Sequence, residues 1–293
     1  MKANRRKAIQ MMATAAIGGT ALQAMPIVNL KNKTMDGGKL KGNIRHSVCR
    51  WTYDFLTLDE LCKAGKDIGL VAIDLVEPKE WEVLKRNGLE CSMCSGAAIS
   101  LTEGWNRTEY HSTLVKNYTE HIGYVSKAGY KNLVCFSGNR KGMDDETGMK
   151  NCLAGLKKII GLAEKQGVVI QMELFNSKVN HPDYMADKSA WGIELCKRLG
   201  SENFKLLYDI YHMQISEGDI IHTIQDYHQY FGHYHTAGVP GRHEIDDNQE
   251  LNYPAIMAAI VDTGFKGYVA QEFIPVAQDK IGSLRMAVNL CDV

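Results

Sequence analysis

The sequence predicts an α/β fold, a single (β/α)8 barrel of the TIM barrel type, in which parallel strands alternate with helices. Short apolar stretches alternate with helical stretches from residue 43 onward, and eight such strands can be counted, the number that closes a barrel of this kind. The chain has 293 residues, and barrels of roughly 250 residues are common as single domains. An open doubly wound sheet is the alternative, but no G-x-G-x-x-G motif follows any expected strand.

The expected strands are short, rich in β-branched or other apolar residues, and bounded by glycine, asparagine or a charged residue. The intervening helices would supply the right-handed crossovers that parallel strands of one sheet require. The strands are expected over residues 44–51, 71–76, 89–95, 132–136, 168–173, 205–209, 232–236 and 268–272.

Helical stretches between these strands carry apolar residues at three- and four-residue spacing. The segment 57–69 starts at Thr57, which is suited to be the N-cap, and Glu60 three residues later completes a capping box. This segment stops at Gly69, a residue that commonly ends helices. Further helices are expected within residues 148–167, 216–232 and 252–264.

The N-terminal residues differ in character from the rest of the chain. Arg5 and Arg6 precede a stretch, 8–25, that contains no charged residue. A basic region followed by an uncharged apolar one is typical of an export signal, and the paired arginines favour the twin-arginine type. The protein is therefore expected to be periplasmic, without stable membrane insertion after processing. We expect a signal peptide, a linker and the barrel domain over residues 1–30, 31–42 and 43–293.

The charge balance indicates a small-molecule partner. The chain holds 34 basic and 34 acidic residues and has no long basic run. Because proteins bind nucleic acid largely through lysine and arginine contacts to phosphates, this composition argues against a nucleic-acid partner. A homo-oligomer is left open.

The eight cysteines are interpreted as buried small apolar residues, because most of them lie within apolar periodic segments. Cys91 and Cys94 form a C-x-x-C motif, yet an offset of three places them on opposite faces of a strand. No second C-x-x-C completes a zinc site.

Metal-competent side chains stand at the ends of four consecutive expected strands, the edge at which barrel enzymes carry their chemistry: Glu173, Asp209, His235 and Glu272. Any one of them alone could be a helix cap, a solvated carboxylate or a core histidine. Four at one level of a barrel favour a metal site. Three carboxylates and one imidazole suit a hard divalent cation, Mn²⁺ or Mg²⁺ first, with Co²⁺ and Zn²⁺ also compatible.

The segment FGHYHTAGVPGRHEID, 231–246, extends this arrangement. His233 shares the strand face of His235 but lies one layer deeper, where it could orient its neighbours. The following Gly-Val-Pro-Gly turn would bring Arg242 and His243 over the mouth of the barrel. A guanidinium group there suits a substrate carboxylate.

The sequence resembles hydroxypyruvate isomerases, within the wider group of xylose-isomerase-like TIM barrels, from about residue 44 to residue 273. The most specific part is G-x-P-x-R-H-E followed by N-Y-P. The other matching stretches are SVCRW, IDLVEPKEW, LLYDIYHMQISEGD and GYVAQEFIP.

The resemblance implies site residues and an activity. It implies that the four strand-end residues hold a divalent metal, that Glu173 and Glu272 also act as acid and base, and that further residues line the substrate pocket, namely His212, Arg242 and His243. The implied enzyme is an intramolecular oxidoreductase of the aldose-ketose type. It would interconvert a small 2-keto, 3-hydroxy compound and its aldehyde isomer by proton transfer through an enediolate, with hydroxypyruvate and tartronate semialdehyde as the expected pair.

Three alternatives stay open. Related ketose epimerases carry histidine at the position of His235, so a ketose 3-epimerase or another sugar isomerase of the same group is the first. A metal-dependent endonuclease is the second, although the basic groove that it needs is not evident in the sequence. A non-catalytic ligand-binding barrel is the third, and the paired glutamates count against it.

Overall fold

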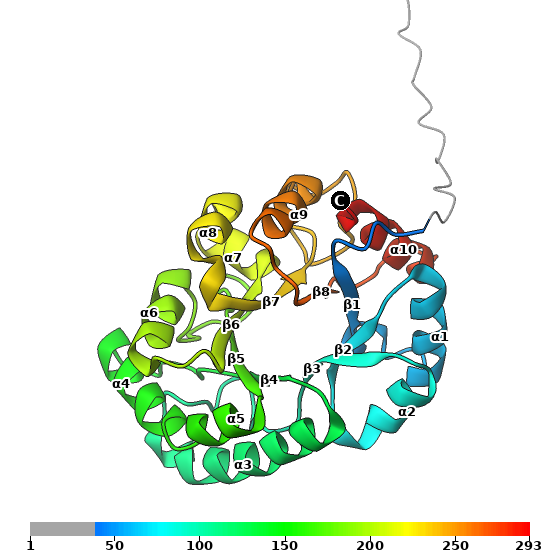
Figure 1. Ribbon diagram of the computed structural model, residues 1–293. Helices are drawn as coiled ribbons and strands as arrows, with labels where there is room; N and C mark the ends of the chain where they lie inside the picture. Colours follow the sequence, from blue (N-terminus) through cyan, green and yellow to red (C-terminus); the bar gives the residue numbers. More distant parts are fainter. Residues whose placement is uncertain (1–38) are drawn as a thin grey trace, which may run out of the picture. The chain divides into compact units, whose positions relative to one another are not determined.

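The computed structural model describes residues 39–293, which form a closed barrel of eight parallel strands in chain order (Figure 1). The expectation of a single (β/α)8 barrel is confirmed. The predicted signal peptide, 1–30, and most of the predicted linker, 31–42, lie outside the described residues. Closure comes from the parallel pairing of the first and last strands, in which His46 is the partner of Val269.

Every expected strand is present, and no boundary differs from the prediction by more than two residues. Alternation of apolar strands with amphipathic helices is therefore enough to locate the strands of this barrel. The strands are β1 Arg45–Cys49, β2 Ala72–Val76, β3 Glu90–Cys94, β4 Asn132–Cys135, β5 Val169–Glu173, β6 Phe204–Asp209, β7 Phe231–Thr236 and β8 Tyr268–Gln271.

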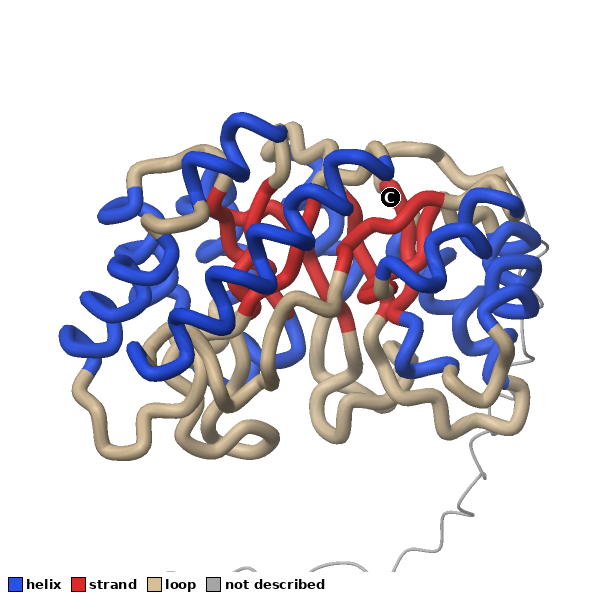
Figure 2. Tube along the Cα trace, turned by 90° about the horizontal axis from the view of Figure 1, so that it is seen from below, coloured by secondary structure: helices blue, strands red, loops and turns tan. Residues whose placement is uncertain are grey.

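The helices surround the strands as an outer layer (Figures 1 and 2). They are α1 Leu58–Ile68, α2 Trp81–Arg86, α3 His111–Ala128, α4 Asp145–Leu156, α5 Ile160–Gln166, α6 Ser189–Leu199, α7 Ile210–Ser216, α8 Ile220–Tyr227, α9 Tyr253–Asp262 and α10 Lys280–Cys291. Short 3-10 helices cover Arg50–Tyr53, Pro78–Glu80, Thr108–Tyr110 and His228–Tyr230.

Helix α1 begins and ends as its sequence predicts. The Thr57 side chain accepts a hydrogen bond from the Glu60 amide, the Glu60 side chain accepts one from the Thr57 amide, and Gly69 takes the left-handed conformation at φ 102°. The stretch expected as one helix over 148–167 is instead two, α4 and α5, because the backbone leaves helical geometry at Ile159, where φ is −117°. The structure also contains α2, α3, α6, α7 and α10, which the sequence patterns did not single out.

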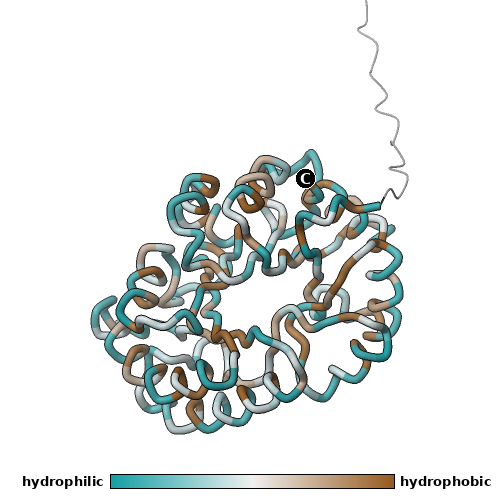
Figure 3. Tube along the Cα trace, in the orientation of Figure 1, coloured by the Kyte–Doolittle hydropathy of each residue, from teal (hydrophilic) through white to brown (hydrophobic). Residues whose placement is uncertain are grey.

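The main hydrophobic core lies between the strands and the helices. Along the outer helices, apolar and polar segments alternate, as expected for helices that pack one face against a barrel (Figure 3). A second, small cluster of Met93, Val134 and Leu207 joins β3, β4 and β6. All eight cysteines are buried and free, which confirms their interpretation as apolar packing residues. Among the described residues, no helix has the length and apolar character needed to cross a membrane.

Candidate active site

Four strands deliver their carboxyl-terminal side chains to one point. The ligand atoms of Glu173, Asp209, His235 and Glu272 all lie within 4.8 Å of one another, and all four residues are buried. Glu173 and Asp209 end β5 and β6, His235 lies in β7, and Glu272 directly follows β8. The structure thus brings together the four residues that the sequence placed at consecutive strand ends.

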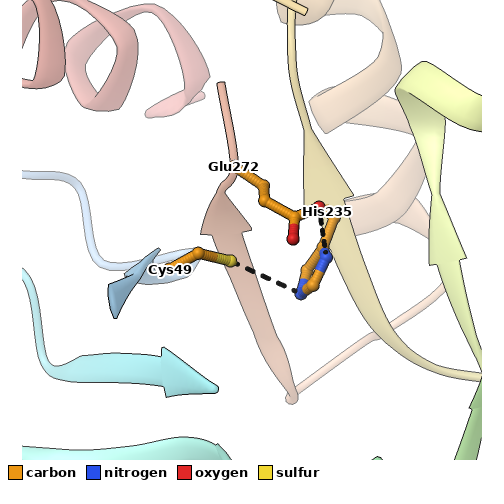
Figure 4. A group of neighbouring side chains, drawn as sticks. All are labelled: Cys49, His235 and Glu272. Atoms are coloured by element: carbon orange, nitrogen blue, oxygen red, sulfur yellow. Dashed lines mark hydrogen bonds and ion pairs between the residues drawn. The ribbon is translucent and has the colours of Figure 1, made fainter. Parts of the chain in front are cut away.

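The His235 ring presents its two nitrogens to different neighbours. Nδ1 lies 2.9 Å from Glu272 Oε2 and 3.2 Å from Glu173 Oε1. Nε2 lies 2.9 Å from Asp74 Oδ1 and 3.9 Å from Cys49 Sγ. The ring therefore stands between the Glu272 carboxylate and the Cys49 thiol (Figure 4), with Nδ1 toward the carboxylate cluster.

Arg242 reaches the cluster from the loop after β7. Its Nη2 lies 2.6 Å from Glu272 Oε2 and 3.7 Å from Asp209 Oδ2. Its guanidinium carbon lies 5.2 Å and 5.5 Å from the ring centroids of Trp51 and Tyr211, a cation–π arrangement. The Arg242 backbone is left-handed, at φ 61°, a strained conformation that the loop imposes at this position.

His212 lies in the first turn of α7 and is buried. Asn176 Nδ2 donates to His212 Nδ1 at 2.6 Å, so the ring hydrogen is assigned to Nε2. Nε2 lies 3.7 Å from Asp209 Oδ2 and has no hydrogen-bond partner among the described residues. Burial lowers the pKa of His212 well below its usual range, so the neutral ring offers an N–H donor to the site.

His243, which was also predicted to line the pocket, is exposed, and its Nδ1 lies 3.1 Å from the Ile274 carbonyl oxygen. It is not among the residues that line the mouth cavity. Its role in substrate binding stays a prediction.

The two glutamates have pKa values that are shifted in opposite directions. Burial, together with the nearby Glu272 charge, raises the pKa of Glu173 to about 7. Burial also acts to raise the pKa of Glu272, but His235 and Arg242 outweigh it and hold that pKa well below its usual range. Two carboxyl groups whose pKa values are driven apart in one site are the arrangement that acid/base enzymes use.

The donor set fits a divalent cation. Asp209 Oδ2 is buried and makes no hydrogen bond among the described residues, and neither does Glu173 Oε1, although it lies 3.2 Å from His235 Nδ1. Burial and the Glu272 charge also raise the pKa of Asp209 well above its usual range. A buried carboxylate oxygen without a partner is costly, and a cation held by three carboxylates and an imidazole would satisfy both atoms.

A cavity of about 330 Å³ opens onto the cluster. Glu173, Arg242 and Glu272 are its charged lining residues. The rest of its wall is apolar or aromatic and consists of Trp51, Leu75, Leu101, Phe136, Phe175 and His181. The arrangement can therefore bind a small ligand with its reactive, oxygen-bearing end on the charged residues.

Several of these residues were not found from the sequence. Asp74 could have been noticed as a charged residue within the apolar strand IDLV, but nothing local shows that it contacts His235. Trp51 and Tyr211 lie in the matching stretches SVCRW and LLYDIYHMQISEGD, but no pattern assigned them to the cavity, because their place in it depends on how distant loops fold over the barrel.

The fold and the site together define a class of protein. It is a (β/α)8 barrel with a buried cluster of carboxylates and one imidazole at the carboxyl ends of its strands. The profile of the family described as Xylose isomerase-like TIM barrel matches residues 77–285. The chain belongs to this family.

Curated relatives are named as isomerases. The chain is 31% identical over 127 residues to "Putative hydroxypyruvate isomerase" of Danio rerio, which covers 43% of this chain and 46% of that protein. It is 36% identical over 120 residues to "2-oxo-tetronate isomerase" of Cupriavidus necator, and this match covers 41% of this chain and 45% of that protein. The chain thus matches about half the length of these relatives.

Solved structures share the fold. An AP endonuclease of family 2 from Brucella melitensis superposes with a TM-score of 0.71 at 22% identity, covering 82% of this chain and 96% of that one. A structure described as IOLI protein with a binding zinc atom gives a TM-score of 0.67 at 14% identity, covering 85% and 98%. At these identities the likeness establishes the architecture.

Proposed function

We propose that this protein is a metal-dependent isomerase that interconverts a small 2-keto, 3-hydroxy compound and its aldehyde isomer, with hydroxypyruvate and tartronate semialdehyde as the first pair to test. The observation that carries the proposal is the pair Glu173 and Glu272. They face one cavity from the same ligand cluster, and their pKa values are shifted in opposite directions. The names of the curated relatives support an isomerase of this family.

The proposed metal ligands are Glu173, Asp209, His235 and Glu272, and Mn²⁺ or Mg²⁺ is the expected ion. Such a cation, when bound, polarises a substrate carbonyl and so acidifies the neighbouring C–H group. Because the two glutamates would also be ligands, a change in either one can affect both metal affinity and proton transfer.

The proton transfer falls to the glutamates. Glu173, which lines the cavity beside Arg242 and Glu272, removes the proton from the carbon next to the carbonyl. Glu173 then returns this proton to the former carbonyl carbon, and Glu272 accepts the hydroxyl proton and passes it to the former carbonyl oxygen. The His212 Nε2–H hydrogen-bonds the oxygen on which negative charge grows, and Arg242 binds the substrate carboxylate.

One observation favours a second candidate, a ketose 3-epimerase or another sugar isomerase. The cavity measures about 330 Å³, and most of its wall is apolar, with Trp51, Phe136 and Phe175 prominent in it. A three-carbon acid would leave much of this wall uncovered, whereas the C–H face of a longer sugar could lie against the aromatic rings.

The test is a substrate panel assayed with purified protein, with and without added Mn²⁺ or Mg²⁺. It should contain hydroxypyruvate, longer 2-keto acids, ketoses and 2-hydroxy-aldehydes. The proposal expects metal-dependent turnover of a 2-keto, 3-hydroxy acid, and a preference for neutral ketoses would support the second candidate. Full turnover after chelation, or ligand binding without turnover of any panel member, would contradict both.

A further inference from the structure

A buried carboxylate that is not among the proposed metal ligands lies directly behind one of them. Asp74 is in β2 and is 0% exposed. The pairing between β2 and β3 shifts its register on both sides of Asp74, and the next residue, Leu75, has a left-handed backbone at φ 55°. Irregular strand positions of this kind often aim a side chain toward a site.

Four donor groups surround the two oxygens of Asp74. His235 Nε2 lies 2.9 Å from Oδ1, and the Cys49 thiol lies 3.6 Å from the same oxygen. His233 Nε2 lies 3.0 Å from Oδ2, and the Ser92 hydroxyl donates to that oxygen. Histidines 233 and 235 and the carboxylate are all 0% exposed. A buried carboxylate held on both oxygens is fixed in place.

This arrangement decides which nitrogen of His235 faces the cluster. An ionised carboxylate can only accept, so the His235 Nε2 that approaches Asp74 carries a hydrogen. Nδ1 is then the nitrogen presented to Glu272 and Glu173, at 2.9 Å and 3.2 Å. If the ring were rotated about its bond to Cβ, this pairing would be lost.

We propose that Asp74 is a positioning residue, which fixes the ring of His235 so that Nδ1 is the metal-binding nitrogen. Ser92 in turn holds Asp74 by a hydrogen bond, and His233 lies at ion-pair distance from it. The metal-binding part of this proposal rests on the proposed function, whereas the hydrogen bond between Asp74 and His235 does not. Outer partners of this kind typically alter metal affinity by about 10- to 100-fold.

The test compares the wild-type protein with Asp74→Asn in two arms. In the first, metal-free protein labelled with ¹⁵N-histidine is examined by NMR. A slowly exchanging Nε2–H of His235 is expected in the wild type, and faster exchange is expected in the variant, because the neutral amide oxygen of asparagine is a weaker acceptor than a carboxylate. In the second, Mn²⁺ affinity is measured by electron paramagnetic resonance, with an expected weakening of about 10- to 100-fold. The histidine ¹⁴N coupling of bound Mn²⁺ should also change.

Asp187→Asn is the matched control, because Asp187 is also buried but pairs with Arg140 and Ser177, outside the cluster. Its Mn²⁺ affinity should equal that of the wild type. If Asp74→Asn does not fold, Ser92→Ala decides the question, because it removes one donor to Asp74 without touching His235. It should weaken Mn²⁺ binding in the same direction but by less.

Three results would overturn the proposal. The first is an unchanged His235 Nε2–H signal and unchanged Mn²⁺ affinity in Asp74→Asn, and the second is unchanged affinity in Ser92→Ala. The third is two Mn²⁺ ions per wild-type chain, one of which is lost in Asp74→Asn, because Asp74, His233 and His235 would then be ligands themselves. A wild-type protein that binds no Mn²⁺ would instead contradict the proposed function, and the NMR arm would still decide the role of Asp74.

Discussion

Glu173 and Glu272 differ in environment although they share a site, and substitution separates their roles. Glu173→Gln keeps the size of the side chain but removes its ability to accept a proton, so kcat should fall by about 10²- to 10⁴-fold. Glu272→Gln should lower kcat by a similar factor and also free His235 and Arg242 from their shared partner, and both substitutions should weaken metal binding because each glutamate is a proposed ligand.

Metal content must be measured beside kcat in both variants, because each glutamate is also a proposed ligand. Glu202→Gln is a suitable control, since that residue is on the surface and, within residues 39–293, its side chain pairs with Lys205 alone. Wild-type kcat in metal-loaded Glu173→Gln would contradict its assignment as the base.

The raised pKa of Glu173 predicts a pH dependence of stability in the metal-free protein. Its pKa is raised from 4.5 to about 7 on folding, so between these pH values the folded state binds more protons than the unfolded state. The contribution of this group to the free energy of unfolding is therefore fully present below pH 4.5 and is lost as pH rises through about 7.

Glu173→Gln does not titrate, so its stability relative to the wild type should increase as pH rises from 5 to 8. Urea unfolding of both metal-free proteins at several pH values measures this difference. A difference that stays constant over that range would show that Glu173 is not the group responsible.

At the residue scale, the position of a side chain could be predicted from the sequence where that side chain lies at the end of a strand. Glu173, Asp209, His235 and Glu272 could be located because the alternation of strands and helices places strand ends within two residues. Asp74 could not be assigned, because its contact with His235 joins positions 161 residues apart and depends on the irregular pairing of β2 with β3.

At the scale of elements, the loop between β7 and α9 is held by close backbone contacts. Gly238 donates to the His243 carbonyl at 2.9 Å and accepts from the Arg242 amide. A Cβ atom at Gly238 would collide with the Glu244 carbonyl oxygen. Gly238→Ala should therefore displace the loop that carries Arg242.

The expected result for Gly238→Ala is a raised KM for a carboxylate-bearing substrate, because Arg242 would no longer be aligned with the site. Gly161→Ala in α5 is the matched control, since a Cβ there meets nothing within 4 Å, and it should leave KM unchanged. An unchanged KM in Gly238→Ala would mean that the loop tolerates the methyl group or that Arg242 does not bind substrate.

The same contrast between local and distant causes applies to the helices. The limits of α1 could be predicted because its capping box and terminal glycine act within one turn. The break between α4 and α5 could not, because the apolar spacing continues across it while the backbone turns at Ile159. His243 illustrates the same limit in a loop, where sequence position does not show which way a side chain points.

For the whole molecule, the barrel could be predicted from the sequence because strands and helices alternate regularly along the chain. The cavity wall could not be predicted, because it is built from loops whose arrangement does not follow from any local sequence pattern. The substrate therefore has to be identified by assay.

Export stays a prediction that concerns the whole chain. We expect the protein in the periplasm of its host and its retention inside the cell when Arg5→Lys and Arg6→Lys are combined, because the twin-arginine route requires the arginine pair. Fractionation of cells with antibody detection measures this. Export of the double variant at the wild-type level, or a wild-type protein found only inside, would refute the assignment.

The most direct test of the central claim, proton transfer by Glu173 and Glu272 in a metal-dependent site, is turnover in heavy water followed by NMR of the product. With Mn²⁺ or Mg²⁺ supplied, the product should carry solvent deuterium at the carbon that gains a proton, and chelation should abolish both turnover and exchange. Turnover without any exchange would indicate direct hydrogen transfer between carbons, and the assignment of the two glutamates as proton carriers would be wrong.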